Sequence, residues 1–225
     1  MKLITYYTDS HKGMLDEYFL PSLEKINFNI DDLTMKNGNQ YDSDGSYTHS
    51  KFNTITGDKL KFILNSLLMF DEEEYICFSD IDIQFFKNFI DDFNKNYNLY
   101  SQYDIIGQND VPMRGQNGVF CTGFMYIKNT EQVHNFFRTL ISNIHKFEHD
   151  QYCFNHYKHE VKTYLLDSNK YFNIALLNNC TTWSPNQTDY KIPQDIIMHH
   201  ANWTVGVENK LALLKFVKEN VKTLD

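Results

Sequence analysis

The chain has 225 residues, of which 42% are hydrophobic, and its formal net charge at pH 7 is -8. This length can bury one sizeable core, so we expect a single domain over residues 1–225. The acidic balance argues against a nucleic-acid-binding protein with a broad basic face, and no apolar run approaches the ~20 residues that span a bilayer. The N-terminus lacks the apolar centre of a signal peptide, and the four cysteines form no CxxC pair. We therefore expect reduced thiols and a cytoplasmic location.

Strand-like and helix-like segments alternate through the first half of the chain. Residues 3–8 predict a strand, residues 14–26 a helix, residues 57–70 a second helix, and residues 75–79 ("YICFS") a buried strand. The polar stretch at 37–53 is interpreted as a long loop. Asp42 and Asp44 within it resemble the start of a calcium loop, but the remaining ligand spacing is missing and a turn is favoured.

The alternation continues in the second half. Residues 103–107 and 119–128 predict strands, and residues 131–147 predict a long amphipathic helix. Short late strands are expected at 163–167 and 196–200, before a closing helix at 209–224. Strands that alternate with helices predict an α/β fold, with a mostly parallel, mixed central sheet and helices on both faces.

Two acids, Asp80 and Asp82, directly follow the buried strand at 75–79. Ligands bind beyond the carboxyl ends of strands in such sheets, and side chains at i and i+2 of an extended chain point the same way. Two neighbouring carboxylates repel each other, and a cation between or beside them relieves that repulsion. Because oxygen ligands suit Mg²⁺ and Mn²⁺, we interpret the pair as a metal site rather than as a solvated turn.

A helix, a buried strand and Asp-x-Asp in this order resemble the D-x-D glycosyltransferases of the GT-A fold, the nucleotide-diphospho-sugar transferases. Three later segments carry the same resemblance. "CTGFMYIKNT" (121–130) resembles the strand after the acceptor-side loop, "EHDQYCFN" (148–155) an Asp-Gln helix start, and "HHANWTVGVENK" (199–210) the closing segment. Small members occur in large DNA viruses and in bacteria, which implies the host cytoplasm if the source is viral.

The resemblance implies a metal-dependent transfer of a sugar from a nucleoside-diphosphate sugar, with UDP as the expected nucleotide, to a hydroxyl acceptor such as a glycan. It implies Asp80, Asp82 and His200 as ligands of Mn²⁺, or of Mg²⁺. His199 competes with His200, which fits the "HANW" pattern better. The implied nucleotide site comprises Tyr6, Tyr7, Thr8, Lys59, Asp80 and Lys210. The implied sugar and acceptor site comprises Gln108, Thr122, Gly123, Gln151 and Asn202.

The stereochemistry decides whether a catalytic base is needed. An inverting reaction requires a carboxylate that removes the acceptor's proton, with Asp150 as the first candidate and Asp110 as the second. A retaining reaction requires no such base, and Asp150 would then position the sugar. Trp183, Tyr190 and Trp203 are either stacking surfaces for an acceptor sugar or packing residues of the core and loops.

Three other interpretations compete with the transferase. "DIDIQ" (80–84) also resembles the nucleophile loop of haloacid-dehalogenase-type phosphatases, although Gln84 fits that loop poorly. "HKFEH" (145–149) matches the H-x-x-E-H pattern of zinc proteases, but it lies beside the core stripe of the preceding helix, which favours a surface or helix-end role. The non-enzymatic alternative is a sugar-binding module without turnover.

Overall fold

A computed structural model describes residues 1–38 and 52–221 of the chain. The predicted loop at 37–53, with Asp42 and Asp44, lies almost entirely outside the described residues. Within them, no helix is long and apolar enough to cross a membrane. The four cysteines are free thiols, as the sequence predicts.

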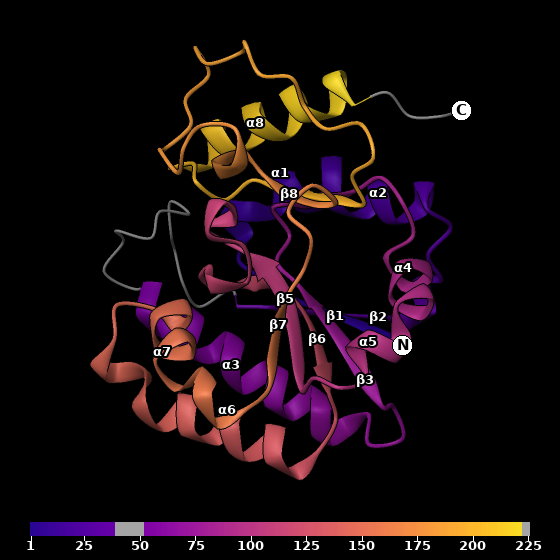
Figure 1. Ribbon diagram of the computed structural model, residues 1–225, viewed down its shortest axis with the longest axis vertical. Coiled ribbons are helices and arrows are strands. Elements are labelled where there is room, and N and C mark those ends of the chain that lie inside the picture. The colour runs from indigo at the N-terminus through magenta and orange to yellow at the C-terminus, as the bar shows by residue number, and fades with distance from the viewer. Residues whose placement is uncertain (39–51, 222–225) are drawn as a thin grey trace.

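A six-stranded mixed sheet forms the centre of the molecule (Figure 1). Its strands follow the order β2-β1-β3-β6-β5-β7. Their bounds are β1 Lys2–Tyr7, β2 Leu33–Asn37, β3 Tyr75–Ser79, β5 Ile105–Asn109, β6 Phe120–Lys128 and β7 Thr163–Leu165. β6 runs antiparallel to both of its neighbours, whereas β1–β2, β1–β3 and β5–β7 pair in parallel. The prediction of a mostly parallel, mixed sheet is confirmed.

Helices cover both faces of this sheet, as predicted (Figure 1). One face packs against α3 (Phe52–Met69), α6 (Glu131–Asn143) and α7 (Asp150–Tyr157). The other face packs against α2 (Leu20–Lys25), α4 (Phe89–Lys95) and α5 (Tyr97–Tyr100).

β3 shows why a strand between two helical layers reads as a continuous apolar run. All five of its residues are buried. Ile76 and Phe78 face the α3 side, while Tyr75 and Cys77 face the α4 side. Because successive side chains alternate between two covered faces, both sets are mainly apolar.

The predicted helix at 14–26 is one helical segment with three parts. It comprises α1 (Lys12–Met14), a π-helical turn at Leu15–Phe19 and then α2. The predicted helix at 57–70 corresponds to α3, which starts earlier, at Phe52. The predicted helix at 131–147 corresponds to α6 and the 3₁₀ turn at Ile144–Lys146 that follows it.

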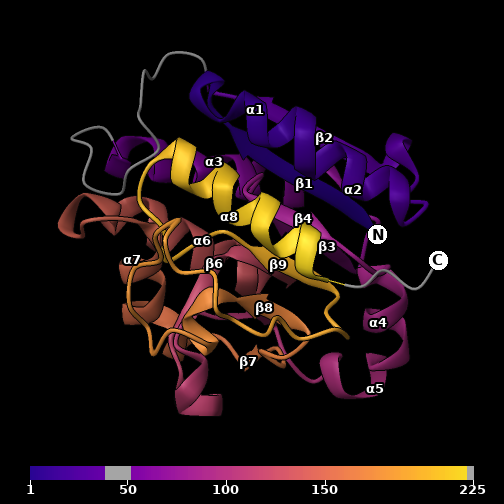
Figure 2. The ribbon, with the colours of Figure 1, turned by 90° about the horizontal axis from the view of Figure 1, so that it is seen from above.

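A small second sheet, absent from the sequence-based expectation, holds the late part of the chain in place. Its order is β4-β9-β8, with β4 at Ile83–Phe85, β8 at Tyr171–Asn173 and β9 at Met198–His200. α8 (Val207–Asn220) lies over this sheet (Figure 2). Because β4 follows Asp82 and pairs with β9, His200 lies opposite Ile83. The second sheet thereby brings the end of the chain to the Asp-x-Asp segment.

Candidate active site

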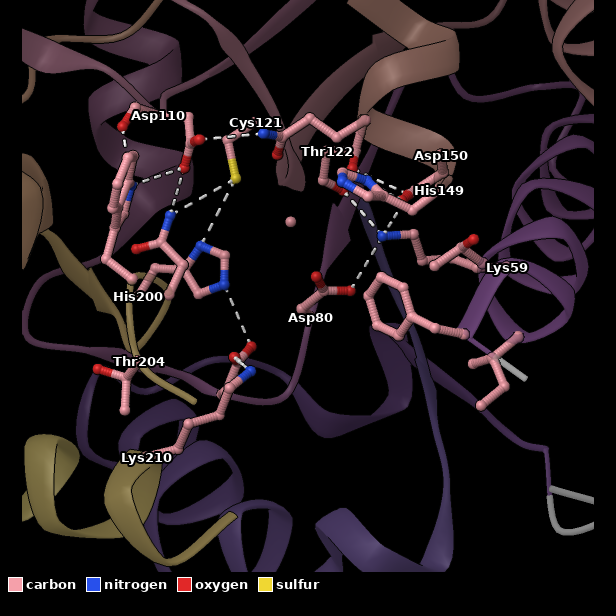
Figure 3. Close-up of a pocket in the computed structure, with 18 of the residues that line it drawn as sticks. Lys59, Asp80, Asp110, Cys121, Thr122, His149, Asp150, His200, Thr204 and Lys210 are labelled. Carbon is pink, nitrogen blue, oxygen red and sulfur yellow. Dashed lines mark hydrogen bonds and ion pairs between the residues drawn. The ribbon is translucent and has the colours of Figure 1, made fainter. Parts of the chain in front are cut away.

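A cavity of about 550 Å³ opens where β1, β3 and β5 end and β6 begins (Figure 3). Nearly every residue that the resemblance implied lines this one cavity. These residues are Tyr6, Tyr7, Thr8, Lys59, Asp80, Asp82, Asp110, Thr122, Gly123, Asp150, Gln151, His200, Asn202 and Lys210. Residues as far apart in the sequence as Tyr6 and Lys210 therefore converge on one site.

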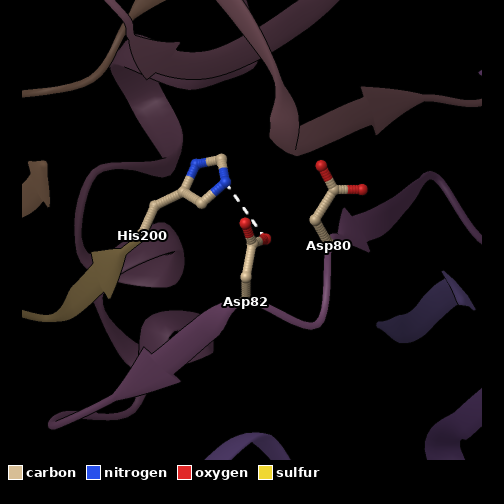
Figure 4. Close-up of side chains that lie close together, drawn as sticks. All are labelled: Asp80, Asp82 and His200. Carbon is tan, nitrogen blue, oxygen red and sulfur yellow. Dashed lines mark ion pairs between the residues drawn. The ribbon is translucent and has the colours of Figure 1, made fainter. Parts of the chain in front are cut away.

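Asp80, Asp82 and His200 form a cluster at the floor of the cavity (Figure 4). One ligand atom from each lies within 4.8 Å of the others. His200 Nε2 is 3.2 Å from Asp82 Oδ1. Among the described residues, no other group of three His, Cys, Asp or Glu side chains comes this close together, and the "HKFEH" histidines belong to none.

The donor set and the space around it fit a divalent cation. Two carboxylates and one imidazole match the ligand preferences of Mn²⁺, and Mg²⁺ accepts the oxygens. Gly123 keeps the cluster open, because a Cβ at this position would lie 2.3 Å from His200 Cε1 and 3.0 Å from Asp80 Oδ2. The backbone N–H of Asp80 donates to the Gly123 carbonyl at 2.7 Å and holds the acidic segment against β6.

The two acids of the cluster differ in their electrostatic surroundings. Burial raises the pKa of Asp80 to about 6; the nearby Lys59 opposes that shift, and Asp82 adds to it. Burial also acts to raise the pKa of Asp82, but Lys210 and His200 hold it well below its usual range. Lys210 Nζ lies 2.6 Å from Asp82 Oδ2. Asp82 is therefore ionised, as a carboxylate that binds a metal must be. The Lys210 ammonium group lies beside it.

Lys59 joins the cluster to Asp150. Its Nζ lies 2.7 Å from Asp150 Oδ2 and 3.5 Å from Asp80 Oδ1, and the lysine is almost fully buried. The Thr122 hydroxyl donates to the same Asp150 oxygen at 2.9 Å. Although burial acts to raise the pKa of Asp150, the Lys59 charge lowers it far below its usual range. A carboxylate held in this way is a poor proton acceptor.

Asp110 is held by neutral donors at the opposite wall of the cavity (Figure 3). Its carboxylate accepts hydrogen bonds from Gln151 Nε2 at 3.0 Å, from Asn202 Nδ2 at 2.8 Å and from Trp203 Nε1 at 3.1 Å. Burial raises its pKa, and these hydrogen bonds work against that shift. The network joins Gln151 and Asn202, both expected at the sugar and acceptor site, to the second candidate base.

The two adjacent histidines face opposite sides of β9, as the sequence argument requires. His200 points into the cavity, whereas His199 is fully buried against Phe172 on the other side. Burial lowers the pKa of His199 to about 3, so this side chain is neutral. Of the two candidates, only His200 lies in the cluster with Asp80 and Asp82.

Gln108 is the one implied sugar-site residue that does not line the cavity. It is fully buried, and its Oε1 contacts His200 Nδ1 at 2.8 Å. A direct contact between Gln108 and a sugar is therefore not available.

The three candidate stacking residues do not all lie at the cavity. Trp203 lines the cavity, whereas Trp183 is buried in the core beneath α8 and its Nε1 donates to the Gln187 carbonyl. Tyr190 packs at the edge of the same core.

Cys121, His149 and Tyr152 are among the side chains at the cavity that were not singled out from the sequence for this site. The Cys121 thiol lines the wall 3.8 Å from His200 Nδ1, and burial raises its pKa well above the usual range. His149 and Tyr152 stack on each other with ring centroids 4.3 Å apart. The signal for the latter two was their place beside the Asp150–Gln151 pair, because a helix that begins at the cavity presents its first turn to it.

Solved structures show the same fold at low sequence identity. A glycosyltransferase involved in glycosylation of the major capsid of PBCV-1 matches 95% of this chain and 98% of its own, at 11% identity and a TM-score of 0.57. The glycosyltransferase GlyE of Streptococcus pneumoniae TIGR4 matches 100% of this chain and 65% of its own, at 14% identity and a TM-score of 0.58. The galactosyltransferase LgtC, in complex with donor and acceptor sugar analogs, matches 99% and 97%, at 11% identity and a TM-score of 0.53.

A family model identifies the chain more directly than these folds do. No curated protein sequence matches the chain. The model of the nucleotide-diphospho-sugar transferases, however, matches residues 13–214, which include the Asp-x-Asp segment, the Asp150 helix and β9. The match covers most of the chain and favours neither the phosphatase nor the protease interpretation. The chain therefore belongs to the nucleotide-diphospho-sugar transferase family, and it is a glycosyltransferase.

Proposed function

We propose that this glycosyltransferase requires a divalent cation, held by Asp80, Asp82 and His200, and that it transfers a sugar from a UDP-sugar to a hydroxyl group of a glycan. The observation that carries the proposal is the cluster itself, in which two carboxylates and an imidazole converge within 4.8 Å at the floor of the family's cavity. Mn²⁺ is the expected ion, because an imidazole ligand favours it over Mg²⁺. Such an ion, when bound, stabilises the negative charge that grows on the departing diphosphate.

We assign the nucleotide to the side of the cavity that Tyr6, Tyr7 and Thr8 form at the end of β1. Lys210 lines the same cavity and carries a positive charge beside Asp82. This position suits contact with the diphosphate. Lys59 was expected to face the diphosphate as well, but its Nζ is bound to Asp150 and Asp80, and we propose that it positions these two carboxylates.

The ion pair with Lys59 supports a positioning role for Asp150 over that of a general base. A base must accept a proton near neutral pH, and the surroundings of Asp150 lower its pKa far below that range. Asp110 accepts three hydrogen bonds in its present arrangement, which suits it to orient Gln151 and Asn202 toward the sugar and acceptor. The anomeric configuration of the product, measured by NMR, decides whether a base is needed.

A panel of nucleotide sugars, each offered with Mn²⁺ and with a chelator, tests the proposal. We expect one UDP-sugar to raise the melting temperature with Mn²⁺ and to be hydrolysed or transferred only with the metal. Stabilisation by a ligand at a hundredfold over its dissociation constant is about 2.7 kcal/mol, which a melting experiment detects. Stabilisation without turnover would favour the sugar-binding module. Phosphate release from aryl phosphates would favour the phosphatase.

A further inference from the structure

Gln108 is a buried polar side chain that the proposed chemistry does not use. It lies in β5 at a shift in the pairing register, because Gly107 pairs with Met125 while Asn109 pairs with Phe120. Such irregularities redirect side chains and are common next to active sites. Here the side chain of Gln108 reaches from the central sheet to the second sheet, where it contacts β8 and β9.

The orientation of the Gln108 amide follows from its partners. Its Nε2 lies 3.2 Å from the carbonyl oxygens of Tyr171 and Phe172, and carbonyls can only accept hydrogen bonds. Both amide hydrogens are therefore used on β8. The remaining atom, Oε1, is an acceptor and lies 2.8 Å from His200 Nδ1.

This arrangement determines the tautomer of His200. Because Gln108 Oε1 cannot donate, His200 Nδ1 must carry the hydrogen of this bond. The Cys121 sulfur also faces Nδ1, but at 3.8 Å it is a longer and weaker partner. The other ring nitrogen, Nε2, faces the cluster, 3.2 Å from Asp82 Oδ1.

His199 provides the opposite case one residue away. Gln84 Nε2 donates to the Leu214 carbonyl at 2.9 Å, which places the amide nitrogen, not the oxygen, 3.3 Å from His199 Nδ1. His199 Nδ1 is therefore an acceptor, and the ring hydrogen lies on Nε2, which has no hydrogen-bond partner among the residues that the structure describes. Two buried glutamines thus give neighbouring histidines opposite tautomers.

We propose that Gln108 is a positioning residue for the metal site, which holds a proton of His200 on Nδ1 and directs Nε2 into the cluster beside Asp82, so that the lone pair of Nε2 is available to the cation. The proposal rests on the metal-dependent function proposed above. It adds that Gln108, a residue of the central sheet whose side chain does not line the cavity, prepares His200 to bind the cation. Outer partners of this kind fix the ring orientation of a metal-binding histidine.

Mn²⁺ binding to Gln108→Met, followed by EPR with and without UDP, tests this role without recourse to activity. Gln84→Met is the matched control, because it removes the same amide from the neighbouring histidine. We expect the Mn²⁺ dissociation constant to rise roughly 10- to 100-fold in Gln108→Met and to change less than about twofold in Gln84→Met. Pulsed EPR of bound Mn²⁺ should show coupling to an imidazole nitrogen in the wild type and in Gln84→Met, and a weakened or heterogeneous coupling in Gln108→Met.

His200→Ala separates a failure of this inference from a failure of the proposed metal site. Wild-type Mn²⁺ affinity in Gln108→Met, together with weak binding in His200→Ala, would overturn the role of Gln108 and leave the metal site intact. Wild-type affinity in His200→Ala would overturn the metal site itself, and the role of Gln108 with it.

A measurement on the wild-type protein covers the case in which Gln108→Met fails to fold. Long-range ¹H–¹⁵N spectra of the ¹⁵N-labelled protein with Mg²⁺ and UDP report which ring nitrogen is protonated. We expect the proton on Nδ1 for His200 and on Nε2 for His199 in the same spectrum. A proton on Nε2 of His200 would overturn the proposal.

Discussion

The two ends of the cavity hold their carboxylates with different kinds of partner. At one end, Asp82 and Asp80 face charged groups, namely Lys210 and Lys59, with His200 beside them. At the other end, Asp110 accepts hydrogen bonds from three neutral side chains. Charged partners can be exchanged for a cation, whereas neutral donors fix the direction of the carboxylate. From this comparison we infer that the carboxylates at the first end take part in charge stabilisation. The hydrogen bonds to Asp110 at the second end fix the shape of the cavity.

The largest effect is expected from Asp82→Asn, which removes charge at the first end and preserves shape. Transfer should fall by more than roughly 100-fold, because the loss of a ligand exceeds the loss of an outer partner. The folded protein should also lose Mn²⁺ affinity, measured by EPR. Asp195→Asn is the control, since Asp195 is exposed and, within the described part of the chain, its one ion pair is with Lys87. Near-normal transfer by folded Asp82→Asn protein would remove the distinction between the two ends.

The buried ion pair between Lys59 and Asp150 should have the largest effect on stability. Lys59→Met leaves a carboxylate buried and uncompensated, which costs about 3–5 kcal/mol in free energy of unfolding. Urea denaturation measures this cost. Lys61→Met is the matched control. Lys61 and Asp58 form an exposed ion pair at positions i+3 and i of α3, and such a pair is worth at most about 1 kcal/mol.

The double variant Lys59→Met/Asp150→Asn sharpens this result. It should recover part of the loss, because no unpaired charge then remains and the Asn side chain can still accept from Thr122. If the costs of the two single substitutions simply add, the pair is not coupled and Asp150 is held by other contacts.

A smaller effect is expected from Asp110→Asn, at the neutral end. The amide offers one acceptor oxygen where the carboxylate offers two, so either Gln151, which donates to Oδ2, or Asn202, which donates to Oδ1, loses its partner, whereas Trp203 keeps the backbone carbonyl of Asp110 at 2.9 Å. This should cost about 1–3 kcal/mol in free energy of unfolding. Mn²⁺ affinity should stay at the wild-type value, because the carboxylate is not a member of the metal cluster. A loss of Mn²⁺ affinity comparable to that of Asp82→Asn would show that the two ends act as one.

The smallest effect is expected from Trp203→Phe, compared with the same substitution at Trp183. Each tryptophan donates from Nε1, Trp203 to Asp110 and Trp183 to the Gln187 carbonyl, so each variant should lose about 1 kcal/mol of stability. Only Trp203→Phe should lower kcat/KM for transfer, by roughly fivefold if the same energy is lost at the acceptor. An equal decrease in kcat/KM for Trp183→Phe would mean that general loosening, not the Asp110 network, explains the result.

Five of the six strands of the central sheet were predictable because they carry strong local signals, whereas β2 at its edge, which has no buried residue, was missed. The run at 75–79 is apolar on both faces, and α6 shows a clear stripe of Val133, Phe136, Phe137 and Leu140. The short strands β4 and β8 have only three residues each and were missed. A strand of this length carries too little periodicity to stand out, and its pairing depends on partners that are distant in the sequence.

The candidate site shows the same division. Asp80 and Asp82 lie two residues apart and directly follow a buried strand, so the local sequence indicated a cation site. The ion pair between Lys59 and Asp150, and the contact between Gln108 and His200, join residues 91 and 92 positions apart, and no local pattern encodes them. The resemblance to the transferase family had implied Gln108 as a sugar contact. The shift in register between Gly107 and Asn109 turns its side chain away from the cavity, and a register shift leaves no mark in composition or spacing.

The separation of the cluster along the chain has a consequence for protein synthesis. Ribosomes build the chain from its N-terminus, so every strand of the central sheet is made before β9. A nascent chain at that stage has its acidic pair but neither His200 nor Lys210. The proposed cation site is therefore complete only when one of the last elements to be translated docks beside β4. A premature stop upstream of β9 would remove both His200 and Lys210 from the site.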